Sequence, residues 1–149
     1  MTKTAAFWDS SALVSLCVQQ PASPRAHSLH SRFPPVIWWG SMVEIQSAFC
    51  RLRRDGDITR VERQDAQSRL RLLSAAWREI LPSDRVRDSA FLLLESYPLR
   101  AADSLQLAAA WIWCGQSPAG RRFICGDRRL SEAAATAGFL VLELPTPVR

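Results

Sequence analysis

The stretch AAFWDSSALV, residues 5–14, joins two apolar runs through one acidic residue and two serines. Its first part, residues 5–8, is typical of a buried strand in a parallel sheet. Asp9, Ser10 and Ser11 are residue types that cap helices, so a helix is expected over residues 12–18. A carboxylate at this junction is costly to bury unless a partner compensates its charge. The stretch therefore predicts a strand, a turn and a helix, and it raises the question of what compensates Asp9.

The same alternation of short apolar runs and longer periodic segments continues along the chain. Further strands are expected over residues 36–39, 77–81, 122–125 and 139–142. Further helices are expected over residues 25–32, 42–54, 59–76, 84–96, 105–113 and 130–137. In the helix over 59–76 Val61 should face inward, as should Leu94 in the helix over 84–96. Strands that alternate with helices predict an α/β fold with a mainly parallel sheet.

Length and composition favour one globular domain over residues 1–149, with a tail at 145–149. The net charge of +5 is carried by arginine, because Lys3 is the only lysine. Arginine suits phosphates and carboxylates, which indicates a nucleic-acid or acidic protein partner, although genome composition also explains such a bias. The four cysteines lack CxxC spacing, so buried free thiols are expected. No secretory segment or membrane span is expected, and the sequence predicts a cytoplasmic protein.

Four acidic residues lie in otherwise apolar surroundings at the ends of expected elements. Asp9 and Asp127 follow strands, while Glu44 and Asp103 lie near the starts of helices. Because active sites of open α/β sheets gather at the carboxyl ends of the strands, we expect all four to face one crevice. Such carboxylates repel one another unless a cation joins them, and oxygen ligands suit Mg²⁺ or Mn²⁺. A metal of this kind can activate water to attack a phosphodiester.

Each of the four acids also has an ordinary explanation when it is taken alone. Asp9 and Asp127 could cap helices, and Asp103 could interact with a helix dipole. Glu44 could be an exposed residue in the first turn of its helix. The combined pattern favours a shared site, because the other acids stand in charged surroundings: Asp55, Asp57, Glu62, Asp65 and Glu79.

Four segments resemble the motifs of PIN-domain ribonucleases, specifically the VapC-type toxins of bacterial toxin–antitoxin modules. They are FWDSSALVSL, SMVEIQSAFCRLRRDG, YPLRAADSLQLAAA and ICGDRRLSEAAATAGF, and the similarity extends to about residue 142. The third is the most specific, and the fourth departs from the family pattern in having Cys125-Gly126 before its aspartate. The resemblance implies a three-layer sandwich of about five mainly parallel strands with helices on both faces.

The resemblance also implies an activity and partners: an Mg²⁺-dependent endoribonuclease, with Mn²⁺ as a substitute, that a cognate antitoxin neutralises. Asp9, Glu44, Asp103 and Asp127 would be catalytic and would bind the metal, and Ser11 would support them. RNA phosphates would be bound by Arg100, Arg128 and Arg129. An antitoxin segment would bind a groove of the early helices, with these exposed candidates: Leu13, Leu16, Leu29, Phe49 and Leu52. Homodimers are common in the family, and the apolar segment over 101–113 could contribute to one.

Two other classes of protein compete with the nuclease hypothesis. A phosphoacceptor receiver domain also places aspartates at strand ends, but it needs a lysine at the end of a late strand, and Lys3 is at the wrong end of the chain. A catalytically silent RNA- or protein-binding module on the same fold is the stronger alternative. The complete set of four acids argues against it without removing it.

Overall fold

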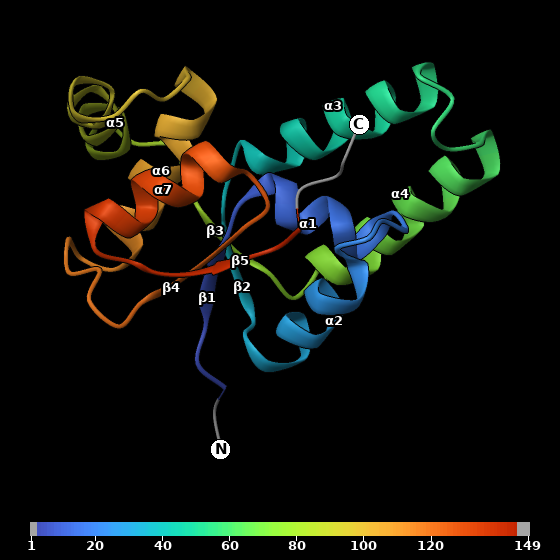
Figure 1. The fold of residues 1–149 in the computed structure, drawn as a ribbon, viewed down its shortest axis with the longest axis horizontal. Helices are drawn as coiled ribbons and strands as arrows, with labels where there is room; N and C mark the ends of the chain where they lie inside the picture. Colours follow the sequence, from blue (N-terminus) through green and yellow to red (C-terminus); the bar gives the residue numbers. More distant parts are fainter. Residues whose placement is uncertain (1–2, 146–149) are drawn as a thin grey trace.

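A computed structural model describes residues 3–145 of the chain, in which helices and strands alternate (Figure 1). The strands are β1 (Ala6–Trp8), β2 (Pro35–Trp38), β3 (Arg78–Ile80), β4 (Arg122–Cys125) and β5 (Leu140–Glu143). The helices are α1 (Ser10–Cys17), α2 (Ser23–Arg32), α3 (Ser41–Arg54), α4 (Arg60–Ser74), α5 (Asp84–Ser96), α6 (Ala101–Trp113) and α7 (Arg128–Ala137). Apart from Pro145, the expected C-terminal tail lies outside the described residues.

The strands form one parallel sheet in the order β3-β2-β1-β4-β5, with β1 at its centre. The strand order reverses direction at β1, because β2 and β3 lie to one side of it and β4 and β5 to the other. Adjacent strands whose connections leave to opposite sides create a crevice at their carboxyl ends, which is where ligands bind in open α/β sheets. Asp9 immediately follows β1 at this position.

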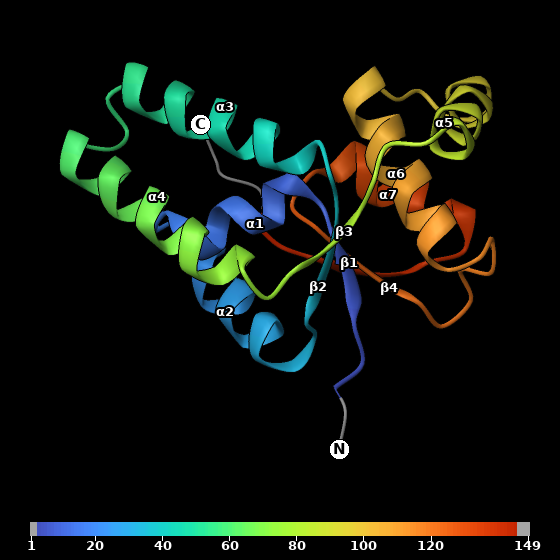
Figure 2. The same cartoon turned by 180° about the vertical axis from the view of Figure 1, so that it is seen from behind.

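Two hydrophobic cores lie on the two faces of the sheet, because successive strand residues point to opposite sides. Ala6 and Trp8 of β1 pack with helices α1 to α4, whereas Phe7 between them packs with α5, α6 and α7. Figure 2 shows the same three layers from behind, with the sheet between its two groups of helices. The predicted three-layer α/β sandwich with a five-stranded parallel sheet is therefore confirmed.

Predicted element positions agree with the structure within a few residues, but the burial of several side chains was predicted wrongly. Val61 on α4 and Leu94 on α5 are exposed, because these helices contact the rest of the molecule along narrower stripes than the sequence suggests. Three of the cysteines are buried and Cys50 is partly so, and all four are free thiols as expected. Within residues 3–145, no helix has the length and apolar character needed to cross a bilayer.

Candidate active site

The four predicted acids all lie at the carboxyl edge of the sheet, each at the N-terminus of a different helix. Asp9 is the N-cap of α1 and Asp127 is the N-cap of α7, where their carboxylates accept hydrogen bonds from Ala12 and Leu130 N–H. Glu44 is in the first turn of α3, and Asp103 is in the first turn of α6. Four positive helix ends therefore face four carboxylates, an arrangement that favours the ionised forms.

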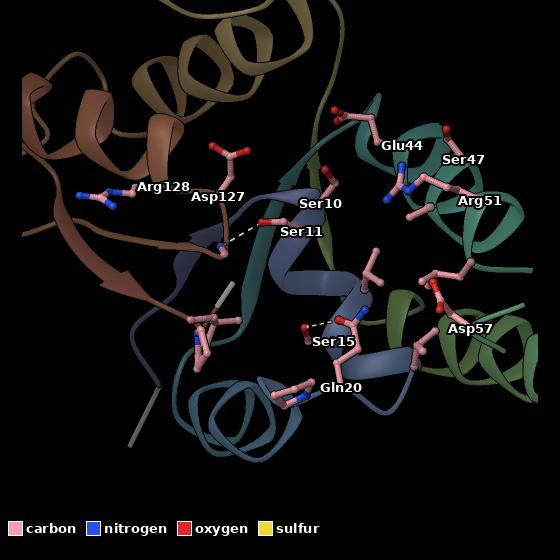
Figure 3. Close-up of a pocket in the computed structure, with 18 of the residues that line it drawn as sticks. Ser10, Ser11, Ser15, Gln20, Glu44, Ser47, Arg51, Asp57, Asp127 and Arg128 are labelled. Atoms are coloured by element: carbon pink, nitrogen blue, oxygen red, sulfur yellow. Dashed lines mark hydrogen bonds between the residues drawn. The ribbon is translucent and has the colours of Figure 1, made fainter. Parts of the chain in front are cut away.

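These helix ends surround a cleft of about 1080 Å³ that extends from the acids along α1 and α3. Glu44, Asp103 and Asp127 line it, whereas Asp9 is only 3% exposed and lies beneath its surface. Figure 3 shows Glu44 and Asp127 projecting toward the cleft from α3 and α7, with Ser10 and Ser11 between them. The structure thus brings together all four acids that the sequence singled out, three at the surface of the cleft and one below it.

Ser11 connects Asp9 to the far side of the site. Its hydroxyl donates to both carboxylate oxygens of Asp9, at 2.8 and 2.7 Å. It also accepts the backbone N–H of Gly126 at 2.9 Å, which is the dashed line at Ser11 in Figure 3. Burial raises the pKa of Asp9 from 3.8 to about 6, although the hydrogen bonds from Ser11 and Ala12 oppose this rise. Ser11, in the first turn of α1, therefore contacts Asp9 directly and joins it to the segment that follows β4.

Glu44 and Asp103 are both harder to ionise than ordinary surface acids. Burial raises the pKa of Glu44 from 4.5 to about 7, and the charges of Asp9 and Asp103 add to the rise. The pKa of Asp103 is raised by burial and by the charge of Asp127, while Arg100 and Arg129 oppose this rise. The negative charges of the four acids therefore repel one another, and each additional negative charge in the site is unfavourable.

Nothing among the described residues neutralises this negative charge by direct contact. The ion pairs found in residues 3–145 are Arg87 with Asp84 and Arg128 with Glu132, so none of the four acids is paired with a cation. The donor set, all carboxylate oxygens, has the chemistry that Mg²⁺ and Mn²⁺ prefer. In the same residues no group of three His, Cys, Asp or Glu side chains is spaced to hold an ion. The residue types thus suit a hard cation, and binding would require the side chains to move together.

The three predicted phosphate-binding arginines all line the cleft but differ in their surroundings. Arg100 and Arg129 act on the charge of Asp103, so their guanidinium groups lie within electrostatic reach of the acids. Arg128 instead donates to Glu132 and is directed away from the cleft (Figure 3). Arg51 of α3 is a further arginine of the lining, on the opposite wall. Arg100, Arg129 and Arg51 therefore offer positive charge next to the acids.

The groove expected from the early helices is lined by different residues from those predicted. Leu13, Leu16, Leu29 and Phe49 are buried in the core rather than exposed, and only Leu52 reaches the cleft, at 9% exposure. The reason is that α1 contacts α2, α3 and α4, which cover its apolar side chains. The apolar lining of the cleft includes Val14, Val18, Ala48, Leu52, Ile58 and Leu144.

One residue of the site was missed in the sequence. Gln106 of α6 is 1% exposed, and its amide donates to Glu44 Oε2 at 2.6 Å and to Ser41 Oγ at 2.7 Å. A signal was present, because a glutamine three residues after Asp103 lies on the same face of a helix that is otherwise apolar. A buried amide on such a face must find polar partners, and the nearest acids of the site are the obvious ones.

Comparison with solved structures identifies relatives in fold. A chain of VapBC2 from Rickettsia felis, bound to a DNA fragment from its promoter, has a TM-score of 0.64 at 11% identity over 95% of this chain and 99% of its own. FitAcB from Neisseria gonorrhoeae gives 0.60 at 15% identity, over 90% and 96% of the two chains. A toxin–antitoxin complex from Klebsiella pneumoniae gives 0.59 at 16% identity, over 85% and 91%. No protein-family model and no curated protein sequence matches the chain.

Each of these similarities covers nearly the whole length of this chain and of the chain compared with it. The chain therefore has the PIN-like α/β fold of toxin–antitoxin components, as its motifs predict. The acids lie at the carboxyl edge of the sheet, where this type of fold places its functional sites.

Proposed function

We propose that this protein is a metal-dependent endoribonuclease and the toxin component of a toxin–antitoxin module, acting in the cytoplasm. The observation that carries the proposal is the convergence of Asp9, Glu44, Asp103 and Asp127 from four helices on one cleft, without an ion-pair partner in the described part of the chain. The fold supports it, because two of the similar structures are a toxin–antitoxin complex and VapBC2. Two elevated pKa values in one cleft are also typical of functional carboxylates.

The four acids would hold Mg²⁺ or Mn²⁺, which supplies Lewis acidity that activates water and offsets the charge of a phosphate. The Ser11 hydroxyl fixes Asp9 by donating a hydrogen bond to its carboxylate, and Leu130 N–H fixes Asp127 in the same way. Both carboxylates are therefore oriented before a metal binds. Arg100 and Arg129 would bind the RNA backbone beside the acids and orient the phosphate.

The test is cleavage of a single-stranded RNA pool by the purified protein with Mg²⁺, Mn²⁺ or EDTA. We expect cleavage that requires the metal and falls by at least about a hundredfold in Asp103→Asn, because removing a charged ligand weakens both metal binding and transition-state stabilisation. Asp57→Asn is the matched control, since Asp57 lines the same cleft at its far end (Figure 3). Cleavage that persists in EDTA or in Asp103→Asn contradicts the proposed mechanism.

A catalytically silent module is the second candidate, and it is favoured by the absence of a group of three closely spaced ligands among residues 3–145. If RNA is bound but not cleaved under any metal condition, this alternative replaces the nuclease proposal.

An antitoxin segment would occupy the apolar part of the cleft, along Val14, Val18 and Ile58, and reach the acids with a basic residue. A short protein encoded next to this chain should copurify with it and abolish cleavage. A homodimer is also part of the proposal, although the apolar residues of α6 from Leu107 to Ala110 are already buried in the core of the subunit. Sedimentation at several concentrations measures the oligomeric state.

A further inference from the structure

Gln106 forms a bridge between the two walls of the site. It extends from α6, one turn after Asp103, and its Nε2 reaches both Ser41 Oγ and Glu44 Oε2 on α3. Ser41 and Gln106 are almost completely buried, at 0% and 1% exposure. The position of Glu44 therefore depends on a side chain from the helix that carries Asp103.

Core packing alone does not account for an amide at this place. Gln106 Oε1 is buried and has no hydrogen-bond partner among residues 3–145, which is unfavourable, and an apolar side chain such as Met would fill the same space without this penalty. The amide orientation is also constrained, because turning Oε1 toward Glu44 would set two acceptors against each other while the carboxylate is ionised. What the amide provides is a pair of N–H donors aimed at Ser41 and Glu44.

These donors distinguish the two oxygens of Glu44. Oε2 accepts the short hydrogen bond from Gln106, whereas Oε1 accepts none from the described residues, and Glu44 lines the cleft. A carboxylate held in this way presents one oxygen to a ligand. Mg²⁺ and the similar Mn²⁺ need compact octahedral geometry, whereas Ca²⁺ is larger and accepts both oxygens of one carboxylate.

We propose that Gln106 is a positioning residue that keeps Glu44 a one-oxygen ligand and thereby makes the site prefer Mg²⁺ and Mn²⁺ over Ca²⁺. This inference rests on the proposed function, since it assumes that Glu44 binds the metal. It adds a determinant of metal selectivity that lies outside the four acids and touches the metal only through Glu44.

The experiment is calorimetric titration of Mn²⁺ and of Ca²⁺ into wild-type protein, Gln106→Met and Gln64→Met. Methionine matches glutamine in size but has no N–H donors, and Gln64 is an exposed residue of α4 remote from the acids. We expect Gln106→Met to weaken Mn²⁺ binding about tenfold or more, in the range found for residues that orient metal ligands. Ca²⁺ binding should change by less than about threefold, because Ca²⁺ tolerates a mobile or two-oxygen ligand. Gln64→Met should leave both affinities unchanged.

Two results would overturn the inference. An equal loss of affinity for Mn²⁺ and Ca²⁺ would show that Gln106 only supports the fold. Unchanged affinities for both metals would show that Gln106 does not act on Glu44. If wild-type protein binds neither metal, the proposed metal site itself is wrong, and the inference falls with it. Melting curves recorded without metal separate misfolding from altered binding. If Gln106→Met does not fold, Ser41→Ala takes its place, because it frees the amide from its second partner and should lower the preference for Mn²⁺ in the same direction.

Discussion

Replacing Asp9 by asparagine should make the metal-free protein more stable at neutral pH, although it removes a central residue of the site. Asp9 is 3% exposed, has no cationic partner among residues 3–145, and has a pKa raised from 3.8 to about 6. A carboxyl group whose pKa is raised by folding favours the folded state below pH 3.8, and this contribution is lost as the pH rises through about 6. Above that range the folded protein must keep a buried charge.

The size of the effect follows from the change in pKa. One pKa unit is worth about 1.4 kcal/mol, so the rise from 3.8 to about 6 corresponds to about 3 kcal/mol of unfolding free energy. Asparagine can still accept the N–H of Ala12 through its amide oxygen. Its NH₂ group replaces one carboxylate oxygen, so one of the two hydrogen bonds from the Ser11 hydroxyl is lost, and this loss reduces the gain in unfolding free energy. We expect Asp9→Asn to raise the unfolding free energy by about 1–3 kcal/mol at pH 8 in EDTA.

Urea unfolding of wild type and Asp9→Asn in EDTA, at several pH values between 4 and 8, measures this difference. The advantage of the variant should be small at pH 4 and full above about pH 7, while Asp57→Asn, an exposed acid, should behave like wild type. Adding Mn²⁺ at pH 8 should stabilise wild type and leave Asp9→Asn nearly unchanged. The reasoning is refuted if the variant is less stable than wild type at pH 8, or if its advantage does not depend on pH.

Three further changes test other parts of the structure. Ser11→Ala removes the donor to Asp9 and the acceptor for Gly126 N–H. It should lower the unfolding free energy by about 1–3 kcal/mol in urea titrations, and a loss below about 0.5 kcal/mol contradicts the bridging role. Arg100→Ala should reduce by about one the slope of log affinity against log salt for a non-cleavable RNA, and an unchanged slope would exclude a phosphate contact. Thr59→Ala breaks the capping box of α4 and should lower the melting midpoint through a loss of about 1 kcal/mol, without any effect on RNA cleavage.

The order of strands and helices was predictable because each element carries a local signal. Short apolar runs mark the strands, and residues such as Asp9, Ser83 and Asp127 cap helices where the sequence places them. Parallel strands bring their carboxyl ends to one edge, which is why Asp9, Glu44 and Asp127 were expected there. Asp103 opens α6, which follows α5 rather than a strand, so its position also depends on how α6 packs against α5 and β2.

Burial was harder to predict because it depends on which helices cover which. Leu13 and Phe49 looked like candidates for an exposed groove, yet α1 is enclosed by three other helices and both side chains are in the core. The opposite error was made for Val61, which was expected to be buried but is exposed. The reason is that α4 is near the edge of its layer and buries few of its residues, such as Ala66 and Leu70. A periodic pattern identifies the face of a helix that is apolar, but contacts between distant segments decide how wide the buried face is.

The two explanations that the sequence offered for Asp127, helix capping and metal binding, are compatible with each other. Asp127 accepts Leu130 N–H through Oδ1, and its Oδ2 accepts no hydrogen bond from residues 3–145. Capping therefore uses one oxygen, fixes the side-chain conformation and leaves the other oxygen for a ligand. A carboxylate fixed in this way loses little conformational entropy when it binds a cation, which is the advantage of preorganisation. Under the proposed function, a bound cation would offset the burial that raises the pKa of Asp9, so the residue that interrupts AAFWDSSALV would cost stability without the metal and favour its binding.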